Sequence, residues 1–358
     1  MAIMSYRAMR LNPVFDDRAK PAATGHTRPA RPAGAALAIC GRTLMALLVL
    51  LITPLFAFAQ AYPSKAIRLV VPASPGGSLD LLGRPIAQYL SESLGQPVVV
   101  DNRPGASQAI GAQIVANAAP DGYTLEVWFS SQLLLPFSRK DVPFDTLRDF
   151  TPIIATARVP NTVVVNPSLP VRSIKELVEY AKANPGKIGY VTSGANSSQH
   201  LGGLLLAMTA NIDILHIPYK GGGPALNDLL GGQVQAGILV MGTVRPHIQA
   251  GKLRALAVVE STRAKAMPNL PTVGEDIPGY AMPTLWCGIV GPRGLPSAIV
   301  SRLNAEIART LVTPQVAKRL EALGYEVTGS SPEQFAEIMK STTEAYRRIT
   351  SAAGIKPQ

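Results

Sequence analysis

Short apolar runs alternate with amphipathic segments along most of this chain, starting with the β-branched run at residues 67–71 (IRLVV). That run predicts a strand ending at Pro72, and a helical pattern of apolar residues begins near Leu79. The loop between them, residues 73–78 (ASPGGS), is small, polar and glycine-bearing. Because a helix starts at this loop, unpaired N–H groups point at whatever lies above it, and an anion suits that position. An ordinary strand-to-helix turn without a ligand fits the same pattern.

The alternation continues and predicts sheets covered by helices. Strand patterns recur at residues 98–100, 123–129, 188–191, 214–217, 235–240 and 253–259, with helical patterns at 107–115, 174–183, 200–208 and 225–230 between them. Strands that alternate with helices indicate parallel strands joined by helical connections. The predicted fold class is therefore α/β.

Two passages, residues 144–165 and the proline-rich 267–283, interrupt this alternation, and each predicts a crossing between lobes. The C-terminal part then resumes with a strand and three helices, at residues 285–290, 296–311, 314–323 and from 332 onward. Two crossings place both ends of the mature chain in one lobe. We therefore predict lobe 1 at residues 62–162 and 285–358 and lobe 2 at 163–284, with two parallel-type sheets, paired crossing strands and a cleft between the lobes.

The N-terminus has the pattern of a secretory signal peptide. A long leader rich in Ala, Pro and Arg precedes an apolar core at residues 44–58, and small residues follow that core. Cleavage after Ala59 or Ala61 would leave a mature chain starting near Tyr62. The alternative is a membrane anchor, but the apolar core is interrupted by Pro54 and is short for a span that needs about 20 residues.

Removal of residues 1–61 changes the charge and the cysteine content. The net charge falls from +11 to +6, because 27 basic and 21 acidic residues remain. No basic run with interleaved aromatic residues is left, so the composition argues against a nucleic-acid partner, while mild positive charge attracts anionic solutes. Of the two cysteines only Cys287 remains, which excludes an intrachain disulfide.

Four strand-to-helix loops are candidates for ligand binding: residues 74–78, 105–108, 193–198 and 220–224. In open α/β sheets, ligands bind outside the carboxyl ends of the strands, so two loops from each lobe are expected to face each other. One carboxylate held by each lobe would suit a dicarboxylate or an amino-acid-like anion. Trp128 and Phe129 end a predicted strand and either line this cleft or belong to the core.

Enzyme interpretations have less support from the same residues. The segment GASQA at residues 105–109 nearly matches the G-x-S-x-G elbow of a secreted serine hydrolase with Ser107 as nucleophile, but the strand ends too early and the last glycine is alanine. G-x-G-x-x-G is absent, and no lysine follows the glycines of the first loop, so nucleotide binding is unsupported. His200, His216 and His247 lie apart along the chain, so neither a metal site nor a cofactor is expected.

Several motifs together resemble the tripartite tricarboxylate transporter substrate-binding proteins, often called Bug-type receptors. They are YPSK (62–65), PGGSLD (75–80), LGQPVVVDNRPG (94–105), PDGYTL (120–125) and HIPYKG (216–221). The resemblance implies a two-lobed periplasmic binding protein of the type II-like, Venus flytrap kind. It implies a non-enzymatic monomer that captures a small carboxylate (a di- or tricarboxylate, an acidic amino acid or an aromatic acid) and delivers it to integral membrane permease subunits. A receptor that signals to a membrane sensor kinase is an alternative.

In that family, loop amides, small hydroxyls and waters hold the ligand, with no arginine clamp. The predicted ligand-binding residues are Ser74, Pro75, Gly76, Gly77, Ser78, Asp80, Ser107, Ser130, Ser193, Gly194, Asn196, Ser197, His200, Tyr219, Lys220 and Gly221. No catalytic and no metal-binding residue is predicted. The chain departs from the family pattern at Ala73-Ser74, Pro85, Asn196 and residues 130–145, which bears on the identity of the ligand.

Overall fold

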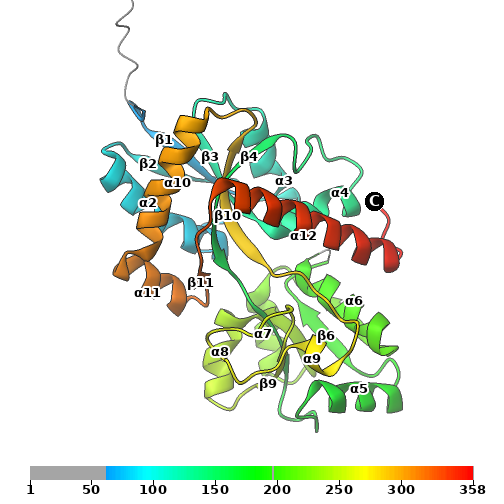
Figure 1. The fold of residues 1–358 in the computed structure, drawn as a ribbon. Coiled ribbons are helices and arrows are strands. Elements are labelled where there is room, and N and C mark those ends of the chain that lie inside the picture. Colours follow the sequence, from blue (N-terminus) through cyan, green and yellow to red (C-terminus); the bar gives the residue numbers. More distant parts are fainter. Residues whose placement is uncertain (1–61, 196, 358) are drawn as a thin grey trace, which may run out of the picture. The chain divides into compact units, whose positions relative to one another are not determined.

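The computed structural model of this chain describes residues 62–195 and 197–357, which belong to one unit, Gln60–Gln358. They form two β-sheets covered by helices (Figure 1). The predicted leader and signal peptide lie outside the described residues, as does Asn196. Among the residues that are described, no helix combines the length and apolar character needed to cross a membrane.

The first sheet consists of β1 (Ile67–Val71), β2 (Val98–Asn102), β3 (Thr124–Phe129), β4 (Phe150–Arg158), β10 (Trp286–Pro292) and β11 (Glu326–Val327). Their order is β11-β4-β10-β3-β1-β2. β1 pairs parallel with β2 and β3, as the βα pattern predicts. β10 runs antiparallel to both β3 and β4, so the sheet is mixed. The reason is that β10 returns from the second sheet and enters between two strands that run the other way.

The second sheet repeats this arrangement. Its strands are β5 (Asn161–Val165), β6 (Gly189–Thr192), β7 (Leu215–Pro218), β8 (Ala236–Val240) and β9 (Arg254–Val258), in the order β7-β6-β8-β5-β9. β6 is parallel to β7 and β8, whereas the crossing strand β5 is antiparallel to β8 and β9. In each sheet, parallel βα units carry loops at one edge and crossing strands complete the sheet.

The helices match most of the predicted amphipathic segments. They are α2 (Ser78–Leu94), α3 (Ala109–Ala116), α4 (Leu135–Ser138), α5 (Ile174–Ala183), α6 (Ser198–Ala210), α7 (Gly222–Leu230), α8 (Met241–Gln249), α9 (Val273–Asp276), α10 (Ser297–Val312), α11 (Pro314–Ala322) and α12 (Pro332–Ala352), with the 3-10 helices η2 (Ala106–Gln108) and η3 (Ser130–Leu134). α2 continues as one helix through Pro85.

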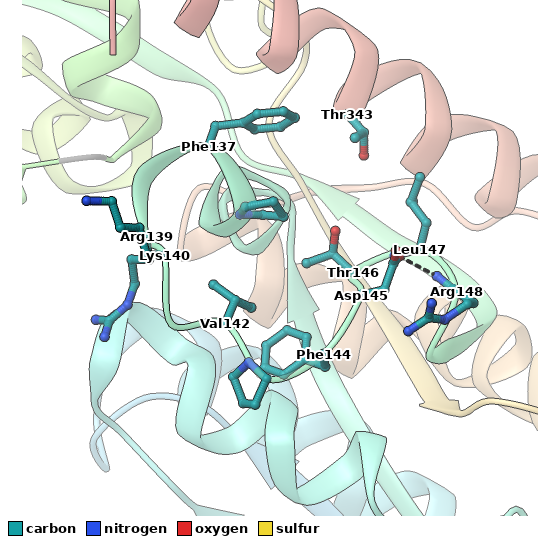
Figure 2. Close-up of a pocket in the computed structure, with 12 residues that line it drawn as sticks. Phe137, Arg139, Lys140, Val142, Phe144, Asp145, Thr146, Leu147, Arg148 and Thr343 are labelled. Carbon is teal, nitrogen blue, oxygen red and sulfur yellow. Dashed lines mark hydrogen bonds between the residues drawn. The ribbon is translucent and has the colours of Figure 1, made fainter. Parts of the chain in front are cut away.

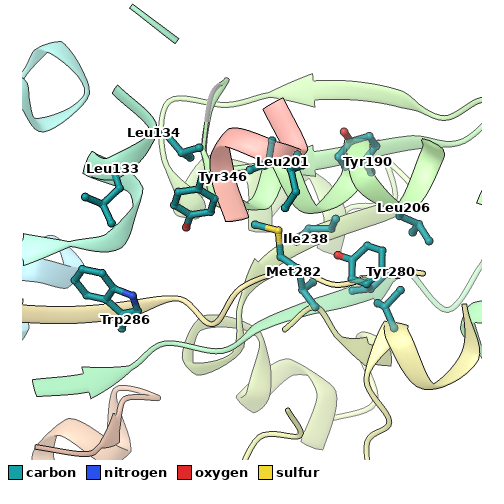
Figure 3. Close-up of a cluster of buried hydrophobic side chains, with 14 of the residues drawn as sticks. Leu133, Leu134, Tyr190, Leu201, Leu206, Ile238, Tyr280, Met282, Trp286 and Tyr346 are labelled. Carbon is teal, nitrogen blue, oxygen red and sulfur yellow. The ribbon is translucent and has the colours of Figure 1, made fainter. Parts of the chain in front are cut away.

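Helix α12 links the first sheet to the second lobe. Its Phe335 is fully buried and meets Trp286 edge-on, with ring centroids 5.1 Å apart. Trp286 donates its ring N–H to Thr342 Oγ1 at 3.0 Å, one helical turn before the buried Tyr346. Figure 3 shows Tyr346 beside Leu201 of α6, within a buried cluster that includes Met282 and Trp286. One continuous core therefore joins α12 and β10 to the second lobe.

Phe335 is the anchor of this arrangement, and its replacement should destabilise the fold. Phe335→Ala should lower the free energy of unfolding by about 3–5 kcal/mol, because a fully buried aromatic ring is removed and a cavity remains. Urea denaturation followed by circular dichroism measures this change. Glu337→Ala, at an exposed position of the same helix, is the control and should alter stability by about 0.5 kcal/mol or less. Equal stabilities of the two variants would contradict the anchoring role.

Candidate functional site

The first predicted loop ends at the start of α2, where backbone groups are left available. Gly77 is the N-cap of α2, Ser78 is the first residue of the helix, and no side chain caps it. Gly76 has a φ of +78°, a conformation that favours glycine, and Gly77 N–H closes the turn on the Ser74 carbonyl at 3.0 Å. Ser74, Gly76 and Ser78 are exposed. The loop therefore presents a helix start with its backbone accessible.

The carboxylate of Asp80 holds this loop in its conformation. Its buried carboxylate accepts hydrogen bonds from Gly76 N–H at 2.8 Å, Arg84 Nε at 2.7 Å and Asn102 Nδ2 at 2.9 Å. The same Asn102 amide group also donates to the Ala73 carbonyl at 2.9 Å. Burial by itself would raise the pKa of Asp80, but these hydrogen bonds outweigh burial and lower it, so the group stays ionised. Asp80 therefore holds the loop in shape, and its two oxygens are already used.

The loop at residues 105–108 follows β2, the parallel neighbour of β1, and adopts an unusual conformation. Ala106, Ser107 and Gln108 have consecutive positive φ angles of 47°, 53° and 79°. Left-handed conformations cost energy for residues other than glycine and tend to occur at functional sites. A Cβ on Gly111 would lie 2.8 Å from the Pro72 side chain, so α3 packs directly against the end of β1. Ser107, which precedes α3, is exposed.

Two other first-lobe candidates are committed to the core. Ser130 is fully buried. Its hydroxyl oxygen accepts a hydrogen bond from the backbone N–H of Trp286 at 3.2 Å, which connects η3 to β10. Trp128 is fully buried and packs against Phe150 with ring centroids 4.4 Å apart. Of the two interpretations that the sequence left open for Trp128, the structure supports the core.

In the second lobe, the loop after β6 is closed by Ser197. Its hydroxyl accepts the His200 N–H at 3.2 Å as the N-cap of α6, and it donates to the Gly194 carbonyl at 2.7 Å. The loop after β7 lies alongside, because Tyr219 N–H donates to the Thr192 carbonyl at 3.2 Å and Gly221 N–H donates to the Ser193 carbonyl at 3.0 Å. The two second-lobe loops therefore form one surface.

The side chains of the loop after β7 differ in whether they have a hydrogen-bond or salt-bridge partner. The Tyr219 hydroxyl is hydrogen-bonded to Asp228 of α7, so this predicted residue supports its own loop. Lys220 is exposed, and the described residues include no salt-bridge partner for its ammonium group. Gly221 precedes α7 with a φ of +110°, and a Cβ there would meet nothing within 4 Å.

His200 and His216 stack on each other beneath these loops, a contact that the sequence did not reveal. Their ring centroids are 3.9 Å apart with an interplanar angle of 11°, and the Tyr190 ring packs against His216 in a tilted arrangement with centroids 5.1 Å apart. His216 Nε2 is hydrogen-bonded to Thr192 Oγ1 at 2.8 Å, and the same hydroxyl lies 3.1 Å from the Gly194 carbonyl. Burial lowers the pKa of both histidines, and the neighbouring ring contributes to lowering that of His216 to about 4.

A small cavity connects this second-lobe surface to the first lobe. Its lining comes from three places: η3 and α4 (Leu134, Ser138), the start of α6 (Ser197, His200, Leu201) and the C-terminal part of the chain (Thr350, Ile355). Two predicted ligand-binding residues, Ser197 and His200, therefore lie at the junction of the lobes. The spacing of residues in the sequence carried no signal for this junction.

A larger hollow of about 700 Å³ lies elsewhere in the first lobe (Figure 2). It is lined by residues 136–148, among them Phe137, Val142 and Phe144, and by Thr343 of α12. None of the predicted ligand-binding residues belongs to its lining. The hollow is built by the segment in which the chain departs from the family pattern. Within residues 62–195 and 197–357, no three His, Cys, Asp or Glu side chains are grouped to hold a metal ion.

The stacked histidines predict a pH dependence of stability. The pKa of His216 lies near 4 in the folded chain and near the usual 6.5 in the unfolded chain, so protons bind preferentially to the unfolded state between these values. The stabilising contribution of the neutral ring is complete above pH 6.5 and is lost as the pH falls toward 4. The melting temperature of the wild type should therefore fall relative to His216→Gln between pH 7 and pH 5.

Comparison with the variant is needed because other buried groups titrate as well. Burial raises the pKa of Glu126 to about 8 and that of Glu260 to about 7, which acts in the opposite direction, but both groups are present in the wild type and in the variant. His247→Gln in α8, outside the stack, is the control and should retain the wild-type profile. Parallel profiles of the wild type and His216→Gln would refute the assignment.

The chain is similar over most of its length to known receptors. Residues 82–355 match the profile of the tripartite tricarboxylate transporter family receptor. BugT of Bordetella pertussis (strain Tohama I) is 36% identical over 302 residues, covering 83% of this chain and 92% of BugT. The structure of R. palustris Rpa4515 with adipate is 35% identical with a TM-score of 0.74, covering 83% of this chain and 100% of that one.

A second solved structure has a similar degree of likeness. MatC (Rpa3494) from Rhodopseudomonas palustris, with bound malate, is 29% identical with a TM-score of 0.69, covering 81% of this chain and 100% of MatC. Family members are periplasmic solute-binding proteins, which are not enzymes, so the hydrolase interpretation of Ser107 is not supported. The predicted α/β fold with two lobes is confirmed. This chain belongs to the family of tripartite tricarboxylate transporter receptors, the Bug-type solute-binding proteins.

Proposed function

We propose that this chain is a periplasmic receptor that binds a small dicarboxylate between its lobes and delivers it to the permease subunits of a tripartite tricarboxylate transporter. The observation that carries the proposal is the pairing of loops within each lobe. Residues 73–78 and 105–108 follow the adjacent parallel strands β1 and β2 in lobe 1, and in lobe 2 the loops after β6 and β7 are joined by the hydrogen bonds from Tyr219 N–H to the Thr192 carbonyl and from Gly221 N–H to the Ser193 carbonyl. Each pair stands at the carboxyl ends of strands and at the start of helices, where anions bind.

The charge distribution of the paired loops suits a dianion. In lobe 1, α2 begins without a side-chain cap, so its first N–H groups remain available to a carboxylate. In lobe 2, Ser193 and the exposed Lys220 supply a hydroxyl and a positive charge. The carboxylate of Asp80 is neutralised by Arg84, so it repels an anionic ligand less than a free carboxylate would. One carboxylate of the ligand would then be held by each lobe.

Two similar proteins support a dicarboxylate as the ligand. Rpa4515 is described with adipate and MatC with malate, and both compounds carry two carboxylates. A ligand that contacts both lobes stabilises the closed arrangement only through contacts that the open arrangement lacks. We propose the predicted division with its first boundary moved by two residues, lobe 1 at residues 62–160 and 285–358 and lobe 2 at 161–284, because β5 begins at Asn161 and belongs to the second sheet. We also propose that the mature chain is a monomer, exported after removal of residues 1–61.

A dicarboxylate should raise the melting temperature of the purified mature chain, because it binds only the folded state. Adipate and malate should each be compared with monocarboxylates of the same length in a thermal-shift assay. A selective shift with the dicarboxylates is expected. If ligand-stripped protein responds equally to mono- and dicarboxylates, or to neither, the dicarboxylate assignment is wrong.

Loss of the Ser193 hydroxyl should weaken binding. Ser193→Ala should raise the Kd for the responding dicarboxylate about 10- to 150-fold, because a hydrogen bond to a charged group contributes roughly 1.5–3 kcal/mol. Isothermal titration calorimetry measures this change. Ser301→Ala, at an exposed position of α10, is the matched control and should leave the Kd unchanged. An unaltered Kd for Ser193→Ala would remove this loop from the site.

The delivery step has its own test. Cells that lack the receptor should lose uptake of the labelled dicarboxylate, and wild-type receptor supplied from a plasmid should restore it. Undiminished uptake together with a lost transcriptional response to the compound would favour the signalling alternative over transport.

A further inference from the structure

A buried chain of polar side chains leads from the second-lobe loop to the crossings between the sheets. The Ser193 hydroxyl donates to Gln199 Oε1, and Gln199 Nε2 donates to Asn161 Oδ1 at 3.2 Å. Asn161 Nδ2 then donates to Glu260 Oε1 at 3.0 Å. The Glu260 carboxylate also accepts the Asn161 backbone N–H, at 3.0 Å and 3.1 Å to its two oxygens. In each of these side-chain hydrogen bonds, the acceptor belongs to the next residue on the way to Glu260.

These residues connect two functional parts of the molecule. Asn161 is the first residue of β5, directly after the outgoing crossing. Glu260 follows β9 and forms an isolated β-bridge with Met282 of the returning crossing. The two segments are also joined by the backbone, since Val259 N–H donates to the Asn161 carbonyl at 3.0 Å. At the other end, Gln199 lies in the first turn of α6, and Ser193 lies in the loop proposed to touch the ligand. This series of hydrogen bonds therefore begins at the loop proposed to bind the ligand and ends at both crossings.

Burying these polar side chains costs free energy that their hydrogen bonds must offset. Gln199 is 4% exposed, and Asn161 and Glu260 are each 1% exposed. A buried polar network that is fully hydrogen-bonded is stiff and specifies a single geometry, whereas an apolar core of the same volume would be at least as stable. Tertiary stability alone therefore gives little reason to place a carboxylate at the crossings.

We propose that Gln199, Asn161 and Glu260 are positioning residues for ligand capture, which couple the Ser193 loop to the two crossings. The dicarboxylate part of this inference rests on the proposed function. Ser193 has one hydroxyl proton and two possible acceptors, Gln199 Oε1 and a ligand carboxylate. When the proton turns to the ligand, Gln199 Oε1 keeps the Ser193 N–H, which lies 3.3 Å away. The network can thus exist in two hydrogen-bonded states, and capture shifts it between them.

A double-mutant cycle on adipate affinity tests the coupling. Glu260→Gln keeps the volume of the side chain but replaces one acceptor oxygen with an amide group, which cannot accept the Asn161 N–H. Glu260→Gln alone should raise the Kd at least 5-fold, although Glu260 does not touch the ligand. In a protein that already carries Ser193→Ala, Glu260→Gln should raise the Kd by much less than 5-fold. A double variant whose Kd equals the product of the two single effects, within about twofold, would overturn the proposal.

The matched control is Glu126→Gln in β3. Glu126 is also a fully buried carboxyl with an amide partner, Gln132 Nε2 at 2.8 Å, but it belongs to the first sheet. Its replacement tests whether loss of any buried carboxyl weakens binding. Glu126→Gln should leave the Kd for adipate within twofold of the wild type. In the double variant, its effect on the Kd should simply multiply the effect of Ser193→Ala. Coupling of Glu126→Gln to Ser193→Ala as strong as that of Glu260→Gln would contradict a specific path.

A pH profile gives a readout that loss of packing would not produce. Burial raises the pKa of Glu260 to about 7, with the Asn161 hydrogen bonds and the charge of Arg158 acting in the opposite direction. The other titratable groups that interact with it are Tyr280 and Tyr346, both of which stay neutral because burial raises their pKa values. Wild-type affinity for adipate should fall as the pH is lowered from 8 to 6.5, and Glu260→Gln should show a flat profile. A wild-type profile in the variant would refute the proposal.

A measurement without ligand separates this inference from the proposed function. Hydrogen exchange followed by mass spectrometry should show faster exchange at residues 193–201 in Glu260→Gln than in the wild type. Residues 76–81 of the first lobe should be unchanged. If neither adipate nor malate binds but this difference appears, the ligand assignment fails and the coupling stands. If exchange at residues 193–201 is the same in both proteins, the coupling fails.

Discussion

Backbone pairing of the two crossings is the constraint on which the rest of the structure depends. Val159 N–H donates to the Leu285 carbonyl at 2.9 Å, and Val259 N–H donates to the Asn161 carbonyl at 3.0 Å. β4 and β10 are antiparallel neighbours on one side of the crossing, and β5 and β9 are antiparallel neighbours on the other. Paired extended segments leave few backbone angles free, so relative motion of the lobes is confined to the short stretch between the sheets.

This constraint explains why both lobes place their loops at strand ends. Each sheet adds parallel βα units beside its crossing strands, and parallel strands direct all their carboxyl ends to one edge. Helix starts and glycine-bearing loops therefore collect at that edge in each lobe. The surface that we propose for the ligand therefore arises from the topology of the sheets, and its side chains modify it.

The side chains that sequence reasoning assigned to the ligand divide into two groups. Asp80, Ser197 and Tyr219 direct their polar atoms to their own loops, and Ser130 directs its hydroxyl to β10. Ser74, Gly76 and Ser78 are exposed at the start of α2, which has no side-chain cap. This division follows from the chemistry of recognition by main-chain groups, because a loop that binds through N–H groups needs other residues to hold its shape. Motifs mark both groups alike, so the sequence could not separate them.

Most elements could be predicted because their signals are local. The strand at residues 67–71 and the helix at residues 174–183 were predicted with their observed bounds. Segments with mixed signals were missed: α8 contains Pro246, and η3 and α4 are only five and four residues long. Their formation depends on burial against distant parts of the chain, which no local pattern records.

By itself, the sequence determined the α/β class, the two crossings, the family and the loops at which a ligand is expected. Those features depend on periodicity, turn chemistry and motif spacing, which act over a few residues. Only the tertiary structure decided that His200 stacks on His216 and that Ser193 is linked through Gln199 to Glu260. Such contacts depend on which buried polar groups meet after folding, and a buried donor or acceptor takes whichever partner the packing brings within reach.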